Sequence, residues 1–231
     1  MAIKSENRWR DLQQRILACR RCPRLVEHCQ QVGQSKRAAY REENYWSQPV
    51  VNFGTAPARL LIVGLAPGAH GANRTGRMFT GDRSGQWLYR ALHRAEFSNQ
   101  ATWENRLDGL ELRDCVITAA AHCAPPGNRP SIQELANCRP FLEETLRQTN
   151  PIVIVVLGQI AWQETKRVLT LLGHSMSSKL RFGHGAETEW TPGRWLVASY
   201  HPSQQNTFTG KLTESMLDKV FSRARELIPK S

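Results

Sequence analysis

The chain has 231 residues, with 31 Lys and Arg against 20 Asp and Glu, so its formal net charge is +11. A hydrophobic content of 40% argues against a disordered chain, and the longest apolar run, residues 152–157, is far too short to cross a membrane. No apolar stretch follows the opening residues MAIKSENRWRD, so we expect a cytoplasmic protein without a secretory signal. The charge favours a polyanionic partner such as DNA, RNA or an acidic membrane surface.

The N-terminal segment, about residues 1–35, is predicted to be helical. Trp9, Leu12 and Ile16 recur at helical spacing, and Pro23 interrupts the helix or starts a new one. The segment 33–53 that follows is polar with scattered aromatic residues, which is typical of a loop.

Four short apolar runs then alternate with helical patterns. The runs are continuous rather than alternating, as is typical of strands buried on both faces. They cover residues 60–63, 115–118, 152–157 and 195–198, and the helical patterns cover residues 86–97, 131–148, 159–172 and 212–228. This order predicts a single domain over residues 1–231, a three-layer α/β/α sandwich with a central four-stranded parallel sheet. Its ligand site is expected at the carboxyl ends of the strands.

The loop after the first strand, residues 64–85, is unusually long and rich in glycine. Glycines let the backbone approach a ligand closely and leave N–H groups free for anions. The loop matches neither a Walker A motif nor a dinucleotide-binding fingerprint. A surface loop without function remains the alternative, although loops of this length inside a compact domain are uncommon unless they are functional.

The loop after the fourth strand begins with Tyr200-His201-Pro202 and continues as a polar cluster through Thr207. A histidine after a strand is often only a structural hydrogen-bonding residue. Here Pro202 stiffens the next step and polar residues follow, which favours a positioned donor.

Six cysteines in a cytoplasmic chain favour metal ligands, catalytic groups or buried thiols over disulfides. Cys19 and Cys22 form a Cys-x-x-Cys pair, and Cys123 and Cys138 form a second, widely spaced pair. Four thiolates bind zinc or an iron–sulfur cluster, and unconnected free thiols are the alternative. Cys115 lies in an apolar strand and is expected to be a buried thiol, whereas Cys29 is ambiguous.

Three segments in chain order resemble the uracil-DNA glycosylase superfamily, specifically its iron–sulfur family 5, the broad-specificity "b" class. Residues 64–82, GLAPGAHGANRTGRMFTGD, are similar to that family's first motif, and residues 201–207, HPSQQNT, to its second. Residues 123–128, CAPPGN, resemble the segment that joins the third cluster ligand to an active-site Asn, here Asn128. The resemblance covers nearly the whole chain, from Cys19 to the final helix.

The resemblance implies a monofunctional DNA glycosylase that flips uracil out of DNA and hydrolyses its glycosidic bond. It also implies a [4Fe-4S] cluster, with zinc as the alternative. The ligands would be Cys19, Cys22, Cys123 and Cys138. The sister family 4 has an acid at the position of Leu65 and a uracil-reading Asn at that of Ala119, so we expect looser base choice here, with hypoxanthine or other deaminated bases also excised.

A mechanism on these residues needs an anion near the sugar and donors near the departing base. Asp82 is the candidate anion and could also orient the attacking water; its alternative role is a helix N-cap, a task that we expect Ser84 to take. His201 is expected to donate to a carbonyl of the base. Phe79 is expected to stack on the flipped base. Asn128 is assigned to the base or the water, and base contacts are further expected from Gly64, Ala66 and Gly68.

Contacts to DNA are expected from two regions. Gln204, Gln205 and Asn206 lie on the loop that resembles the duplex-wedging loop of the superfamily, where polar side chains would fill the hole left by the flipped base. Arg74, Arg77 and Arg83 flank the first motif and would contact phosphates, unless they are simply solvated.

Glycosidic hydrolysis needs no electron, so the cluster is hypothesised to tie the N-terminal helical segment to residues 123–138. The partner is expected to be uracil-containing, double-stranded DNA, and the protein a monomer associated with the nucleoid while it acts, with no membrane contact. Two alternatives stay open: a non-catalytic iron–sulfur nucleic-acid-binding protein on the same fold, and a zinc-bound regulatory protein.

Overall fold

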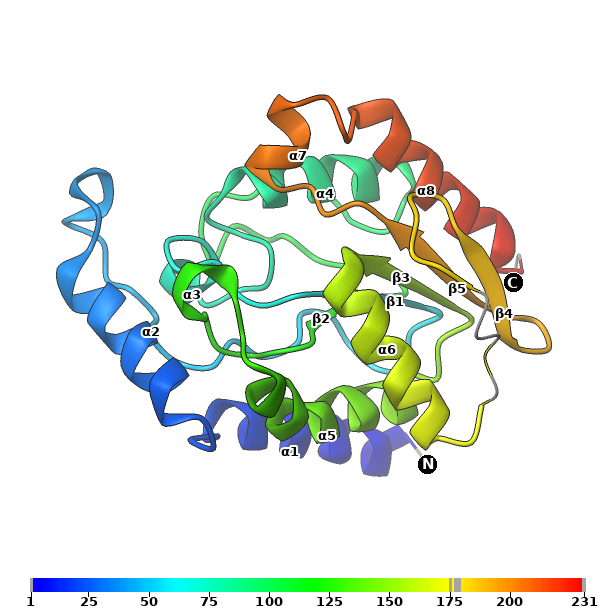
Figure 1. The fold of residues 1–231 in the computed structure, drawn as a ribbon, viewed down its shortest axis with the longest axis horizontal. Coiled ribbons are helices and arrows are strands. Elements are labelled where there is room, and N and C mark those ends of the chain that lie inside the picture. Colours follow the sequence, from blue (N-terminus) through cyan, green and yellow to red (C-terminus); the bar gives the residue numbers. More distant parts are fainter. Residues whose placement is uncertain (1, 175, 177–179, 230–231) are drawn as a thin grey trace.

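The computed structural model describes residues 2–174, 176 and 180–229. Its central sheet has five strands in the order β2-β1-β3-β5-β4 (Figure 1). The parallel strands β1 (Leu60–Gly64), β2 (Cys115–Ala119), β3 (Val153–Leu157) and β5 (Arg194–Ser199) match the four predicted ones. The α/β sandwich is therefore confirmed, but a sheet of only four parallel strands is wrong.

The additional strand is β4 (Glu187–Thr191), which pairs antiparallel with β5 at the edge of the sheet. Its sequence, ETEWT, carries no apolar run, because an edge strand has to bury only one face. Only Trp190 of this strand is buried. Gly193, at a φ of 73°, lies in the turn between the two strands.

Helices cover both faces of the sheet (Figure 1). Apolar side chains alternate along β1: Leu60 and Ile62 pack into one cluster, Leu61 and Val63 into the other. The first cluster lies under α4 (Arg83–Arg94) and α8 (Glu214–Leu227). The second lies under α1 (Ala2–Leu17), α5 (Ile132–Thr149) and α6 (Gln159–Leu171). Within the described residues, no helix is both long and apolar enough to span a bilayer.

The N-terminal helical segment consists of two helices, because Pro23 is the first residue of α2 (Pro23–Ser35). Helix α1 packs on α5, and the Trp9 indole donates to the carbonyl of Gly54 at 3.2 Å. Arg24 of α2 forms a two-pronged bond with Glu134 of α5, at 2.8 and 2.7 Å. These contacts join the segment to the sandwich.

Helix α5 begins where the sequence predicts. The Ser131 hydroxyl accepts the N–H of Glu134 at 3.2 Å, and the Glu134 carboxylate accepts the N–H of Ser131 at 2.6 Å, so the capping box is formed. The capped start fixes the chain between β2 and α5, which carries the short 3₁₀ turn η2 (Pro126–Asn128).

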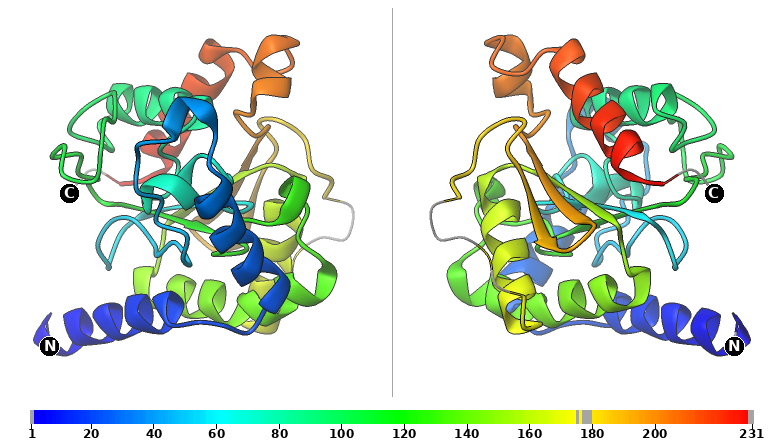
Figure 2. Two further views of the ribbon diagram at one scale, coloured as in Figure 1. Left: turned by 90° about the vertical axis from the view of Figure 1, so that its left-hand side faces the viewer. Right: turned by 90° about the vertical axis from the view of Figure 1, so that its right-hand side faces the viewer.

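The carboxyl ends of the four parallel strands lie along one edge of the sheet, which Figure 2 (left) shows head-on with α2 crossing in front. Two short helices lie at this edge: α3 (Ala72–Thr75) after β1, and α7 (Gln204–Phe208) after β5. The loops that the sequence singled out therefore meet here, as expected for a parallel sheet.

Candidate active site

The loop after β1 folds back on itself through backbone hydrogen bonds. The carbonyl of Gly68 accepts the N–H groups of Gly71 and Asn73, at 3.1 and 3.0 Å. Gly81 returns against the same turn, where a Cβ on Gly81 would lie 2.7 Å from the carbonyl oxygen of Gly71. Only glycine allows so close an approach, so the glycine-rich sequence produces a compact turn rather than an open loop.

The Asp82 carboxylate lies against this turn. A Cβ on Gly71 would meet its Oδ2 at 2.5 Å, and one on Gly68 would meet it at 3.0 Å. The other oxygen, Oδ1, accepts the N–H of Gly85 at 3.2 Å, so Asp82 is the N-cap of α4. The expectation that Ser84 would cap the helix in its place is wrong: Ser84 instead donates to Asp82.

The protonation of Asp82 reflects two opposed effects. Burial raises its pKa above the usual value, while hydrogen bonds from Gly85 and Ser84 and the nearby charge of Arg74 lower it, and burial is the larger effect. One oxygen is thus fixed by the helix terminus, and the second faces the glycine turn. The capping role and the proposed catalytic role are compatible, since they use different oxygens.

Phe79 and His201 come from different loops and stack on each other, with ring centroids 5.8 Å apart and an interplanar angle of 30°. Phe79 has a φ of 55°, and its ring lies across Gly64, where a Cβ would be 2.8 Å from two ring carbons. Burial lowers the pKa of His201 to about 4. The imidazole is therefore neutral at pH 7 and has one N–H to donate.

Asn206 holds the backbone beside this imidazole, because its side-chain amide donates to the carbonyl of His201 at 2.8 Å. Asn206 was expected to contact DNA, which stays a prediction; its amide nitrogen already donates one hydrogen bond within the loop. Gln204 and Gln205 are exposed on the first turn of α7, which is capped by the Ser203 hydroxyl. These two glutamines remain free for the expected contacts.

Asn128 lies at the rim of the edge, exposed and with a φ of 57°. It ends η2, where its own N–H donates to the carbonyl of Pro125 at 3.1 Å. Gly64 ends β1, and Ala66 and Gly68 follow it as half-buried residues of the turn. The structure thus gathers the expected base-binding positions at one edge, with Asn128 the most exposed of them.

Of the three arginines expected to contact phosphates, Arg74 and Arg77 point inward, so the expectation is corrected for these two. Arg74 is 7% exposed; its guanidinium donates to the carbonyls of His70 and Gly81, pairs with Glu43 and lies 3.9 Å from the centre of the Tyr40 ring. It is an internal tie between the first motif and residues 38–43. A buried guanidinium with these partners cannot reach a phosphate.

Arg77 is 8% exposed and forms a two-pronged bond with Asp108, at 2.9 and 2.7 Å. Although burial raises the pKa of the Asp108 carboxyl, hydrogen bonds from Arg77 and from the N–H groups of Glu104 and Leu110 outweigh it and hold the pKa well below its usual range. This motif arginine therefore anchors the loop before β2. Arg83 is half-buried, with its guanidinium 4.6 Å from the centre of the Phe208 ring.

Sequence reasoning missed two aromatic residues at this edge. Phe208, at the end of α7, is 66% exposed; the signal was a single large apolar residue in a polar loop. The Tyr45 hydroxyl lies 3.1 Å from Nδ1 of His70, which joins the segment before β1 to the first motif. No pattern in residues 33–53 marked Tyr45.

The four cysteines of the two pairs line one small cavity of about 20 Å³, together with Leu25, Phe141 and His122. Two donors point at sulfur: the N–H of His122 at Cys138 (3.4 Å) and the side-chain amide of Asn137 at Cys22 (3.5 Å). Burial and the neighbouring Cys19 and Cys22 raise the pKa of Cys138 to about 12. Within the described residues, no three His, Cys, Asp or Glu side chains are already grouped as a metal site.

The two remaining cysteines differ from each other. Cys115 is buried in β2, where burial raises the pKa of its thiol well above the usual value. The Cys29 thiol is buried on α2, where its sulfur accepts hydrogen bonds from the Cys123 thiol and, at 3.3 Å, from the N–H of Ala124. The residue that the sequence left unexplained therefore braces the third cysteine of the two pairs.

Comparisons with known proteins bear on this arrangement. The model of the uracil DNA glycosylase superfamily matches residues 51–225. The chain is 50% identical over 219 residues to the type-5 uracil-DNA glycosylase of Mycobacterium leprae, covering 94% of both chains. It is 44% identical to the type-5 enzyme of Pyrobaculum aerophilum, over 93% of this chain and 91% of that one. A type-4 uracil-DNA glycosylase of Thermotoga maritima is 30% identical over 67% of this chain and 69% of its own.

Proposed function

The chain belongs to the uracil DNA glycosylase superfamily, and we propose that it hydrolyses the glycosidic bond of uracil in DNA, which begins base excision repair. The observation that carries this proposal is the arrangement of three side chains at the carboxyl edge of the sheet. Asp82 lies against the glycine turn, and neutral His201 stacks on Phe79. The relatives that match more than nine tenths of this chain are named as uracil-DNA glycosylases, which disfavours a non-catalytic DNA-binding protein.

In the proposed reaction the bond between the sugar C1′ and the base N1 breaks, and its electron pair leaves with the base. Asp82 stabilises the positive charge on the sugar and orients the water whose oxygen bonds to C1′. His201 donates its N–H to a carbonyl oxygen of the departing base. A preorganised donor of this kind lowers the activation barrier by about 3 kcal/mol. One hydrogen of the water stays in the new hydroxyl group on C1′, and the other passes to solvent as a proton. The released base takes up a proton from solvent.

Two residues that follow or end strands at the carboxyl edge support broad base choice. Leu65 offers only an apolar side chain, and its carbonyl is already occupied by the N–H of Ala121 at 2.9 Å. Ala119 is 2% exposed and carries only a methyl group. A base-binding site without a polar side chain at these positions rejects analogues weakly. We therefore include hypoxanthine and other deaminated bases among the substrates.

We propose further that a [4Fe-4S] cluster binds at Cys19, Cys22, Cys123 and Cys138. The donor set fits: four thiols face one cavity, and two N–H groups point at the sulfurs. The cluster would supply a covalent tie between the connection that joins α1 to α2 and the segment leading to Asn128. Residues 1–35 would then be an N-terminal part of a single domain, held both by protein contacts and by the cluster.

The cluster is tested with Cys123→Ser, and Cys115→Ala serves as the control. Loss of the brown colour and of bound iron in the first variant alone is expected, with lowered stability. Metal analysis separates iron from zinc. Normal folding and normal activity in a colourless Cys123→Ser protein would contradict the structural role.

The catalytic claim is tested with Asp82→Asn. Asn caps helices as well as Asp, so the start of α4 should survive. Single-turnover excision from a uracil-containing duplex is expected to fall by about two to three orders of magnitude. Heating with alkali checks that the product is an abasic site. A rate within tenfold of wild type would remove Asp82 from the mechanism.

Three expectations remain predictions: a double-stranded substrate, a monomer, and a cytoplasmic protein near the nucleoid. Excision from paired and unpaired substrates, size-exclusion chromatography and cell fractionation check them in turn.

A further inference from the structure

A second concave surface lies outside the candidate active site, along α6. Its volume is about 870 Å³, and four of its lining residues are cations: Arg139, Lys166, Arg167 and Arg181. Trp162 and Phe182 form an apolar wall, with their ring centroids 6.2 Å apart. No carboxylate lines this surface within the part of the chain that the structure describes. We call it the α6 groove.

Two of the four cations are held in place by a buried acid. The Glu164 carboxylate, whose side chain is 3% exposed, accepts from Arg139 at 3.0 and 3.1 Å and from Arg167 at 2.6 Å. One negative charge thus holds two positive ones, which leaves an excess positive charge with restricted side-chain motion. A concave surface with one sign of charge concentrates anions.

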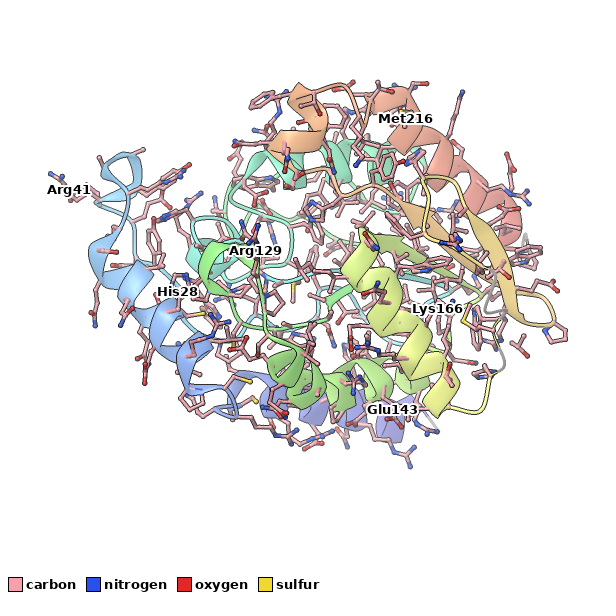
Figure 3. All side chains as sticks on the ribbon, viewed as in Figure 1. His28, Arg41, Arg129, Glu143, Lys166 and Met216 are labelled. Atoms are coloured by element: carbon pink, nitrogen blue, oxygen red, sulfur yellow. The ribbon has the colours of Figure 1, made fainter. Side chains whose placement is uncertain are left out.

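The other two cations are not paired with Glu164 among the described ion pairs. Lys166 projects from α6 toward the returning chain, with its amino group 3.5 Å from the carbonyl oxygen of Leu180 (Figure 3). Arg181 is exposed. Neither side chain has a carboxylate partner among the described ion pairs, so both are available to an anionic ligand.

The groove begins next to the candidate active site. Gln159, at the first turn of α6, lines it, and the preceding Gly158 lies beside His201, whose Cβ would be 3.4 Å from a Cβ on Gly158. Helix α6 has 13 residues and therefore runs about 20 Å away from the carboxyl edge. A nucleic-acid strand that leaves this edge along α6 would meet Gln159 first and the cations Lys166 and Arg167 further along the helix.

We propose that the α6 groove binds an unpaired stretch of nucleic acid, which extends the proposed function from the flipped base to the strand beside it. A rigid duplex across the carboxyl edge would not follow the face on which α6 lies, whereas a flexible single strand can. Cations and aromatic walls together are typical of single-strand binding surfaces. The position beside the catalytic edge favours a strand of the substrate over an acidic peptide.

The test measures binding of a fluorescent oligothymidylate of about eight nucleotides, within the usual span of such surfaces. The variant is Lys166→Gln with Arg181→Gln. Losing two single-strand phosphate contacts should reduce the slope of log Kd against log salt by about 1.4. The ratio of the variant's Kd to the wild-type Kd should therefore be about 25-fold larger at 0.1 M salt than at 1 M salt. The matched control, Arg94→Gln with Lys219→Gln, removes the same charge from the opposite face and should leave the slope nearly unchanged.

The oligonucleotide carries no uracil, so the result does not depend on excision. Excision of uracil from a short blunt duplex is measured separately, should be unchanged in the groove variant, and verifies that it is folded. Unchanged oligothymidylate binding would overturn the proposal. A groove variant that loses binding to polyglutamate but keeps binding to oligothymidylate would also overturn it, in favour of an acidic peptide.

Discussion

Gly64 provides the sharpest test of how the fold shapes the base-binding surface. The change is Gly64→Ala, which adds one methyl group at the end of β1. Its Cβ would lie 2.8 Å from Cε2 and Cζ of Phe79, whereas carbon atoms in contact prefer about 3.5–4.0 Å. The Phe79 ring must therefore retreat by about 1 Å.

A shift of that size should disturb both folding and catalysis. Overpacking of this kind costs about 1–3 kcal/mol of stability. A displacement of about 1 Å in a catalytic surface costs about 100-fold in rate, or about 2.7 kcal/mol of barrier. Single-turnover excision of uracil measures the rate, and urea unfolding measures the stability. Gly183→Ala is the matched control, because no atom lies within 4 Å of its added Cβ, and it should change neither quantity.

A double-mutant cycle isolates the cause. In a Phe79→Ala background the clash is absent, so Gly64→Ala should have little further effect on the rate. The reasoning is refuted if Gly64→Ala alone keeps the rate within threefold of wild type. It is equally refuted if the loss is the same with and without the Phe79 ring.

Three further results are expected. Arg77→Ala should lower the free energy of unfolding in urea by about 3–5 kcal/mol, because it leaves the buried carboxylate of Asp108 without its cation. A loss below about 1 kcal/mol would contradict the buried pair. Asn206→Ala should cost about 1 kcal/mol of stability and slow excision, because the His201 carbonyl loses its donor; unchanged kinetics would show that this brace is dispensable. The excision rate should stay level from about pH 8 to about pH 6, because burial keeps His201 neutral down to about pH 4. The rate should fall only at more acid pH, as Asp82 is protonated. A fall centred near pH 6.5, where free histidine titrates, would be inconsistent with a buried neutral imidazole.

The parallel strands were predictable because each is buried on both faces and therefore has a continuous apolar sequence. The edge strand β4 was not, since residues 187–191 bury only Trp190 and look like a polar loop. The same physics explains the helices: α5 was predictable to within a residue at its start, because its capping box is formed by local hydrogen bonds.

The site shows a different limit. The sequence motif marks Arg74 and Arg77 as notable but carries no information on the direction of either side chain. Glu43 lies 31 residues before Arg74, and Asp108 lies 31 residues after Arg77, so only the fold brings the partners together. A basic residue in a motif beside a DNA site suggests a phosphate contact by its charge alone. Burial reverses that interpretation.

The match to the family model begins at residue 51, yet residues before it support the candidate site. The amide of the buried Asn73 donates to the carbonyl of Cys29 at 3.2 Å, and the Arg74 guanidinium is paired with Glu43, so two neighbouring residues of the glycine loop take their partners from the first 50 residues. Trp9 contributes to the core beneath the sheet. A fragment cut at the family boundary would therefore keep every proposed catalytic side chain and lose the supports of the loop that carries Asp82.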